Sequence, residues 1–228
     1  MMRSMLVLGA VALLACVPVS ANWFEDFDSY ANDSSMHGQG GWKGWDNNPG
    51  ATAYVRDDQA LSLPHSVEIA GNSDLVHEYF GYTSGVWTYT AWQYVPENFQ
   101  GVSYFILLNT YNDFGPYNWS TQVHFESATN LVISDFENAS LPLIRGQWVE
   151  LRNVIDLDND TQSFYYNGQL LTTKSWTGGV SGNGVLNIGA VDLFANGASP
   201  VYYDNISLVP EPAAVALLLV GALALRRR

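Results

Sequence analysis

The fold class follows from residues 148–174, which read WVELRNVIDLDNDTQSFYYNGQLLTTK. In the first part, Val149, Leu151 and Ile155 are interleaved with charged residues, which is the pattern of a strand buried on one face. An acidic turn cluster follows, and Asn167-Gly168 is the dipeptide most typical of a tight hairpin. Residues 148–174 therefore predict an antiparallel meander of three strands.

The rest of the chain shows the same all-β character. Clusters of Gly, Asn, Asp, Ser and Pro recur between runs rich in β-branched and aromatic residues, and no window shows a helical period. About a dozen antiparallel strands in one chain of this size need two packed sheets. The sequence thus predicts one all-β domain, a two-sheet antiparallel sandwich. The predicted strands cover residues 23–29, 51–56, 66–70, 87–95, 102–109, 119–126, 131–136, 148–157, 162–166, 169–174, 185–189 and 201–208.

Composition excludes several functional classes. The 228 residues include 22 acidic and 9 basic side chains, for a formal charge of −13, so no nucleic-acid partner is expected. Aromatic residues make up 14% of the chain and charged residues only 14%, which argues against disorder. The single cysteine, Cys16, excludes an intramolecular disulfide and a cysteine-based zinc site.

Residues 1–21 have the features of a secretory signal peptide, which we expect to be a short helix. Arg3 precedes an apolar run from Leu6 to Val17, and small residues lead to Ala21, after which cleavage is expected. The run is shorter than the ~20 apolar residues of a membrane-spanning helix. Cys16 offers an alternative, because Leu13-Leu14-Ala15-Cys16 faintly resembles a lipoprotein box. The first interpretation makes signal peptidase a partner during export.

A second targeting segment is expected over residues 209–228. Pro210-Glu211-Pro212 is followed by an apolar stretch from Ala213 to Leu225 and by Arg226, Arg227 and Arg228. The arginines favour a short hydrophobic helix with a cytoplasmic end, which by itself predicts a tail anchor. The order of the three parts closely resembles the PEP-CTERM sorting signal. The resemblance implies a Gram-negative bacterium, transient insertion into the inner membrane, processing by an exosortase, and a destination in the cell envelope or outside the cell.

The remaining residues, 22–208, resemble a known superfamily. The stretches 24–30, 148–168 and 201–208 are similar to the opening and closing strands of laminin-G and concanavalin A-like jelly rolls. The resemblance implies a jelly-roll sandwich whose first and last strands pair. The superfamily holds lectins, carbohydrate-binding modules, glucanases and adhesion domains, so the fold alone does not choose among these functions.

No catalytic motif points to an enzyme. A retaining glycosidase needs two carboxylates about 5–5.5 Å apart. Glucanases of this superfamily carry them on one strand as Glu-x-Asp-x-Glu or Glu-x-Asp-x-x-Glu, a string that this sequence lacks, and a Gly-x-Ser-x-Gly elbow is missing too. We therefore expect a non-catalytic protein. A divergent glycan hydrolase or lyase and a purely structural surface protein stay open as alternatives.

A structural calcium site is a further hypothesis. Asp204 shares a strand face with Ile206 and Leu208, and a buried carboxylate needs a partner. If the first and last strands pair, Asp26 or Asp28 would approach Asp204, and the like charges would repel unless a cation or a proton intervened. Ca²⁺ held by these three aspartates would resolve the repulsion. The four histidines show no spacing typical of a zinc site.

Two clusters of aromatic residues in loops are the candidate binding residues. Flat aromatic faces stack on sugar rings, and nearby amides and carboxylates bind the hydroxyl groups. A tryptophan in a long loop can equally plug one end of the sandwich. Residues 22–209 hold 21 acidic and five basic side chains, so the expected extracellular polysaccharide is neutral, or acidic and bridged by calcium. The candidates for glycan binding are Trp42, Trp45, Tyr111, Asn112, Tyr117 and Trp119.

Overall fold

The computed structural model describes residues 23–180 and 183–211. The expected signal helix, Pro212, the apolar stretch and the three terminal arginines lie outside these ranges. Within the described ranges, no helix is long and apolar enough to cross a membrane. The helical segments there are two turns of 3-10 helix, η1 (Trp45–Asn47) and η2 (Pro49–Ala51).

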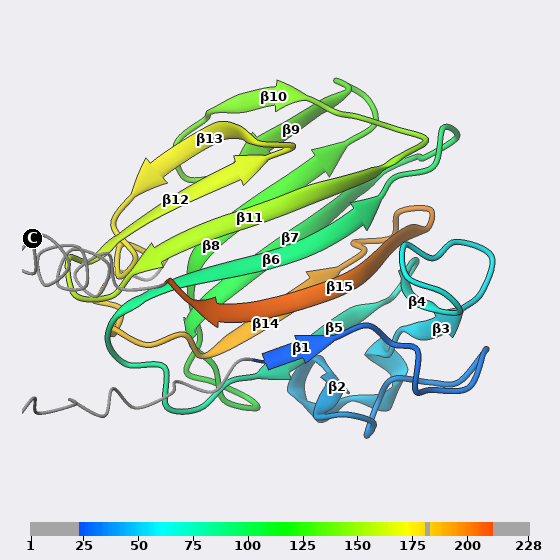
Figure 1. Ribbon diagram of the computed structural model, residues 1–228, viewed down its shortest axis with the longest axis horizontal. Coiled ribbons are helices and arrows are strands. Elements are labelled where there is room, and N and C mark those ends of the chain that lie inside the picture. Colours follow the sequence, from blue (N-terminus) through cyan, green and yellow to red (C-terminus); the bar gives the residue numbers. More distant parts are fainter. Residues whose placement is uncertain (1–22, 181–182, 212–228) are drawn as a thin grey trace, which may run out of the picture.

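The strands form two antiparallel sheets that pack face to face (Figure 1), which confirms the predicted sandwich. The larger sheet has the strand order β13-β12-β11-β6-β15-β4-β3, with β1 paired to β15, and the smaller has the order β10-β9-β8-β7-β14-β5-β2. The strands are β1 (Trp23–Glu25), β2 (Trp42–Gly44), β3 (Tyr54–Arg56), β4 (Ser66–Ile69), β5 (Asp74–Glu78), β6 (Val86–Tyr94), β7 (Val102–Thr110), β8 (Asn118–Glu126), β9 (Leu131–Ser134), β10 (Ser140–Pro142), β11 (Trp148–Asp156), β12 (Thr161–Tyr166), β13 (Gln169–Lys174), β14 (Ala190–Phe194) and β15 (Val201–Pro210).

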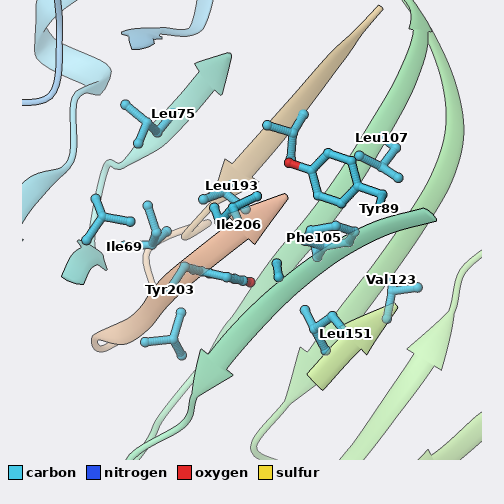
Figure 2. Packing of buried hydrophobic residues seen from close by; sticks show 14 of the residues in the cluster. Ile69, Leu75, Tyr89, Phe105, Leu107, Val123, Leu151, Leu193, Tyr203 and Ile206 are labelled. Carbon is cyan, nitrogen blue, oxygen red and sulfur yellow. The ribbon is translucent and has the colours of Figure 1, made fainter. Parts of the chain in front are cut away.

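The core lies between the two sheets and is rich in aromatic side chains (Figure 2). Tyr89 of β6 meets Phe105 of β7 with 5.8 Å between ring centroids, and Tyr203 of β15 lies 6.5 Å from Phe105. Each such side chain contributes about 1.5–3 kcal/mol when it leaves water. The buried hydroxyl groups are satisfied, because Gln93 Nε2 donates to Tyr203 Oη at 2.7 Å and the Tyr79 and Tyr89 hydroxyls are 2.8 Å apart.

Two sequence predictions about pairing are confirmed. Strands β11, β12 and β13 form the expected meander, with Asn167 at φ 49° and Gly168 at φ 74° in the hairpin turn. Strand β1 pairs with β15 in the register Trp23 to Leu208. The last strand runs to Pro210, and the backbone N–H of Glu211 still donates to Val86 O at 2.9 Å. The folded domain therefore extends beyond the expected limit at residue 208.

Four strands of the smaller sheet were not predicted, namely β2, β5, β10 and β14. The predicted strand at 185–189 is wrong, because the strand in this region is β14, at 190–194. Strands β5 and β14 are buried on both faces, so they lack the alternation of apolar and polar residues that marks a half-exposed strand. These strands form part of the face that carries the candidate site.

Candidate functional site

The outer face of the smaller sheet carries a second apolar cluster, separate from the core. Along β7, Phe105 and Leu107 point into the core, whereas Ile106 and Leu108 belong to the outer cluster. Successive side chains of a strand alternate between faces, so both faces of this sheet are apolar at its centre. Ile106 is 4% exposed and Leu108 is fully buried, which means that other side chains cover this outer face.

A groove of about 480 Å³ lies over this outer cluster. We call it the outer groove. Its walls combine aromatic rings with acidic and amide side chains, the composition expected of a site that binds a small polar ligand with an apolar face. The lining residues are Trp45, Asp74, Tyr104, Ile106, Tyr117, Trp119, Gln122, Asp192, Phe194 and Asn196.

Four aromatic rings, which we call the aromatic cluster, gather at one side of the groove: Trp45, Tyr111, Tyr117 and Trp119. Trp45 and Trp119 are nearly parallel, with 14° between ring planes and 6.0 Å between centroids. Tyr117 lies 4.7 Å from Trp45, and Tyr111 meets Trp45 edge-on at 5.0 Å. Tyr111 is only 6% exposed and supports the other three rings from below. Trp45, Tyr117 and Trp119 line the groove and offer the flat apolar surface that a sugar ring requires.

Asp46 holds the aromatic cluster together. Its backbone is in the left-handed region at φ 55°, a conformation that aspartate tolerates better than most residues. This turn directs the side chain toward the 111–117 loop, where Asp46 Oδ1 accepts hydrogen bonds from Phe114 N at 2.8 Å and from Tyr117 Oη at 2.5 Å. Asp46 N donates to Tyr111 Oη at 3.0 Å. The bond to Asp46 raises the pKa of Tyr117, so its phenol stays protonated at neutral pH.

Lys43 connects the same loop to the sheet. Its ammonium group pairs with Asp113 Oδ1 at 2.7 Å and with Glu78, and it lies 5.3 Å from the centre of the Tyr111 ring. Burial alone would lower the pKa of Lys43, but the hydrogen bonds with Asp113 and Glu78 raise it. The lysine is therefore charged and occupied by its own neighbours.

Two carboxyl groups meet on the floor of the groove. Asp192 lies in the middle of β14 and is 3% exposed, and Asp74 begins the neighbouring strand β5. In the pairing register Asp192 stands opposite Val76 and Asp74 opposite Phe194, which makes the two acids diagonal neighbours on one face. Burial raises the pKa of both carboxyl groups, and the charge of Asp74 raises that of Asp192 further.

The two carboxyl groups are hydrogen-bonded to each other, which requires a shared proton, and one oxygen atom of each has no other donor in the described part of the chain. Asp74 Oδ1 and Asp192 Oδ1 are both buried, and neither receives a hydrogen bond from a residue within 23–180 or 183–211. An isolated buried carboxylate is expensive, so the pair holds a proton or takes up a donor from outside the chain. The groove wall therefore contains a buried acid pair that shares a proton.

Tyr104 of β7 and Gln122 of β8 also line the groove. Gln122 Nε2 donates to Asp135 Oδ2 at 2.5 Å, and the same carboxylate pairs with His124 Nδ1. Tyr104 stacks on Phe194 with 5.7 Å between centroids and 23° between ring planes. The Gln122 amide and the Tyr104 hydroxyl are thus placed to bind polar groups of a ligand in the groove.

Trp42 does not belong to this site. It is 1% exposed and lies in the core, where its Nε1 donates to Glu25 Oε2 at 3.3 Å and its ring meets His77 at 5.1 Å. Strand β2 alternates, so Trp42 turns inward and Lys43 turns outward. With no exposed face, the Trp42 ring packs between the sheets and cannot stack on a sugar.

The other predicted site residues are divided between the groove and its surroundings. Trp45, Tyr117 and Trp119 come together as expected, and Tyr111 lies beneath them. Asn112 is exposed and lines a separate shallow depression together with Glu78 and Phe80, not the groove.

The three aspartates of the predicted calcium site are not brought together. Asp204 is fully buried, and Oδ2 accepts hydrogen bonds from Leu61 N at 2.7 Å and Ser62 N at 3.0 Å. Asp28 Oδ1 accepts from His65 N at 2.9 Å, and Asp26 Oδ1 accepts from Asp28 N at 3.1 Å. In the described part of the chain no three acidic, histidine or cysteine side chains form a group that could hold a metal ion. Asp204 and Asp28 anchor the 61–65 loop instead.

Sequence reasoning missed Asp74, Tyr104, Gln122, Asp192 and Phe194. Asp192 left a signal, because it interrupts the apolar run Ala190-Val191-Asp192-Leu193-Phe194. A charged residue within a run buried on both faces is costly unless the residue has a partner or a function. Because the strand was predicted at 185–189 and not at 190–194, Asp192 was not recognised as an acid inside a buried strand.

Comparisons with known proteins establish the fold. No family model matches the chain, and no curated protein matches it. Among solved structures it is similar to a sialidase (8% identity, TM-score 0.55), over 84% of this chain but only 19% of the sialidase. It is also similar to the globular domain of T. cruzi calreticulin (11% identity, TM-score 0.54), over 86% of this chain and 90% of that domain.

A third similar structure is a mutant alginate lyase solved in complex with alginate tetrasaccharide. It shares 13% identity with the chain at a TM-score of 0.55, over 85% of this chain and 98% of the lyase. At such low identity these likenesses show a shared jelly-roll fold. Because the matched proteins include enzymes, the likeness to them leaves the catalytic question open.

Proposed function

We propose that the chain is an exported, non-catalytic protein that binds polysaccharide in the outer groove. The observation that carries the proposal is the groove itself, where Trp45, Tyr117 and Trp119 line one side and buried polar groups lie on the floor. A sugar ring has apolar C–H faces and a polar rim, so it is complementary to such a surface. The chain shares the fold of part of a sialidase and of an alginate lyase, two proteins that act on glycans, and this likeness supports a glycan as the ligand.

The architecture of the aromatic cluster also supports binding. Asp46 and Lys43 fix the 45–47 turn and the 111–117 loop to each other and to the sheet. A surface that is rigid before the ligand arrives loses less conformational entropy on binding. A mere plug over the outer apolar cluster would not need polar groups such as Gln122 beside it.

The test is oligosaccharide binding by the folded domain and by two matched variants. An array of neutral, amino and uronate oligosaccharides identifies the best ligand, and calorimetry then measures its dissociation constant. We expect Trp119→Ala to weaken binding about tenfold, because one aromatic face is worth roughly 0.5–1.5 kcal/mol beyond its buried area. Phe80→Ala removes an aromatic ring that is 80% exposed and outside the groove, so it should leave binding unchanged. Equal loss in both variants, or no binding to any array member, would overturn the proposal.

Glycan hydrolysis is the second candidate function, and the Asp74–Asp192 pair favours it. A glycosidase needs one protonated and one ionised carboxyl group, and a pair that shares one proton supplies both forms in one groove. Their placement on two neighbouring strands explains why no single-strand motif occurs in the sequence. Release of reducing ends from the bound polysaccharide, lost in Asp192→Asn, would replace the binding function with this one.

Export and sorting complete the proposal, and their support is the sequence pattern alone. Signal peptidase would act after Ala21 and an exosortase near Pro210-Glu211-Pro212, after transient insertion of residues 213–225 in the inner membrane. The mature protein would then reside at the cell surface or in the extracellular matrix. Mass spectrometry of the exported protein should find a C-terminus close to residue 211. An intact Arg228 on the exported protein would contradict this part.

A further inference from the structure

We propose that the outer groove is selective for polysaccharides that carry primary ammonium groups, that is, for hexosamine units without an N-acetyl group, and that Asp74 and Asp192 bind the ammonium. This inference rests on the proposed glycan-binding function and narrows its ligand class. It starts from the charges that the groove does and does not contain.

The groove is acidic and holds no cation of its own. None of the five lysines and arginines between residues 22 and 209 lines it. Lys43, which turns outward from β2 of the same sheet, is engaged by Glu78 and Asp113. A uronate or sulfated glycan would therefore bring negative charge toward carboxyl groups that nothing in the groove offsets.

The buried acid supplies the second observation. Asp192 is 3% exposed, lines the groove and is hydrogen-bonded to Asp74 through a shared proton. One oxygen of each carboxyl group has no other donor among the described residues. A neutral sugar hydroxyl satisfies one such oxygen but leaves the charge of the pair uncompensated. An ammonium group supplies three donors together with the opposite charge, so it takes the place of the shared proton and compensates both carboxylates.

The aromatic rings favour the same group. A cation within about 6 Å of the face of a tryptophan or tyrosine ring is attracted by the ring quadrupole. Trp45, Trp119 and Tyr104 line the groove together with the two acids. A glucosamine unit that stacks on the aromatic cluster thus places its ring on an apolar surface and its ammonium group near negative charge.

The groups that the structure describes around Asp74 and Asp192 do not provide a positive charge that would compensate the two carboxylates. Asp46 of η1 adds negative charge, since its field raises the pKa of Asp74, and Tyr104 of β7 and Tyr203 of β15 are phenols whose pKa values are raised by burial. These phenols are neutral at mildly acidic and neutral pH. The pair therefore carries a proton when the groove is empty, and an arriving ammonium group releases that proton to the buffer.

The experiment compares two hexasaccharides that differ only in acetylation, β-1,4-linked glucosamine and β-1,4-linked N-acetylglucosamine. Calorimetry at mildly acidic pH and moderate salt, repeated in buffers of different ionisation enthalpy, gives the affinity and the number of protons released. We expect the glucosamine oligomer to bind at least about tenfold tighter and to release protons, because hydrogen bonds to charged groups are the strong ones. The acetylated oligomer should release none.

Matched variants separate recognition from general attraction between a polycation and an acidic protein. Asp192→Asn and Asp74→Asn should each abolish proton release and the preference for glucosamine, with melting temperatures that show the fold is retained. Asp57→Asn removes an equal charge from an exposed turn and should change neither quantity. Equal loss in all three variants, or proton release that persists in Asp192→Asn, would overturn the inference.

The remaining outcomes separate this inference from the proposed function. Binding of the acetylated oligomer alone, sensitive to Trp119→Ala, would retain glycan binding and overturn ammonium selectivity. Binding of a uronate hexamer only in the presence of Ca²⁺ would also overturn it and would make the acid pair a cation ligand. Absence of binding to every oligosaccharide would overturn both proposals.

Discussion

Trp42 and Trp45 stand three residues apart in one glycine-rich stretch, yet they lie on opposite faces of the same sheet. Trp42 is part of a buried aromatic group around His77, whereas Trp45 lines the outer groove. Trp42 lies in β2 and turns inward, whereas Trp45 begins the 3-10 turn η1 after the strand has ended. Gly44 lets the chain turn directly after β2, since a Cβ there would lie 2.0 Å from Asn48 O. The same residue type therefore stabilises the fold at one position and forms a ligand surface at the other.

Replacing each tryptophan by alanine tests this difference and has the largest expected effect. Trp42→Ala removes a ring that contacts Phe27 at 5.7 Å and His77 at 5.1 Å, so it should lower the free energy of unfolding by about 3–5 kcal/mol. Trp45→Ala should cost about 1 kcal/mol but weaken oligosaccharide binding about as much as Trp119→Ala. Urea denaturation and calorimetry measure the two quantities. A large stability loss in Trp45→Ala would mean that the aromatic cluster is mainly structural.

Acid should lower the free energy of unfolding through His77, which belongs to the buried aromatic group around Trp42. Burial lowers the pKa of His77 to about 4 from 6.5, and its ring is enclosed by Trp23, Trp42 and Tyr79. The unfolded chain takes up the proton first, so this contribution is complete above about pH 6.5 and declines as the pH falls toward about 4. The total is on the order of 3 kcal/mol, at 1.36 kcal/mol per pKa unit.

The control for this prediction is His77→Gln, which cannot titrate. Urea unfolding of both proteins across the same pH series isolates the histidine, because the carboxyl groups contribute equally to each. The difference in free energy of unfolding between the two proteins should shrink as the pH falls from neutral. A difference that is constant with pH would show that His77 is not buried in its neutral form.

The part of the fold that could be predicted from the sequence is the part exposed on one face. The meander β11–β13 was predictable because Val149, Leu151 and Ile155 alternate with charged residues and Asn167-Gly168 fixes the turn. Strands β5 and β14 have few exposed residues, so periodicity does not distinguish them from their neighbours. The order of strands across each sheet depends on pairings between distant residues, which a single sequence does not display.

The candidate site likewise has one part that the sequence predicted and one part that it did not. Its aromatic half could be predicted, since Trp45 and Tyr117 stand in polar stretches where large rings need a reason to be present, and Trp119 follows Tyr117 closely at the start of β8. Its acidic half could not, because Asp74 and Asp192 are 118 positions apart in the sequence and meet only through the pairing of β5 with β14. The spacing of Trp42 and Trp45 did not separate the two rings, because β2 ends at Gly44 and Trp45 begins the 3-10 turn η1.

The smallest expected effect concerns Asp46, which joins the segments that carry the aromatic cluster. Asp46→Ala removes the acceptor for Phe114 N and Tyr117 Oη, with little loss of stability because both donors can bond to water instead. Without that acceptor the Tyr117 ring is no longer fixed beside Trp45, so oligosaccharide affinity should fall about three- to tenfold through the added cost of ordering the ring on binding. Asp46→Asn keeps an oxygen at the same position and should retain most of the affinity.

The phenol of Tyr117 provides a readout that does not depend on any ligand. Its pKa is raised by the hydrogen bond to Asp46, with burial second and the charge of Asp46 third. An ultraviolet titration should therefore show one tyrosine that ionises at lower pH in Asp46→Ala than in the parent protein. Asp46→Asn removes the charge and keeps the acceptor, so its titration should lie between the two. If Asp46→Ala lowers affinity while the tyrosine titration is unchanged, Asp46 acts on the ligand directly and the aromatic cluster is held by Lys43 and the loop backbone instead.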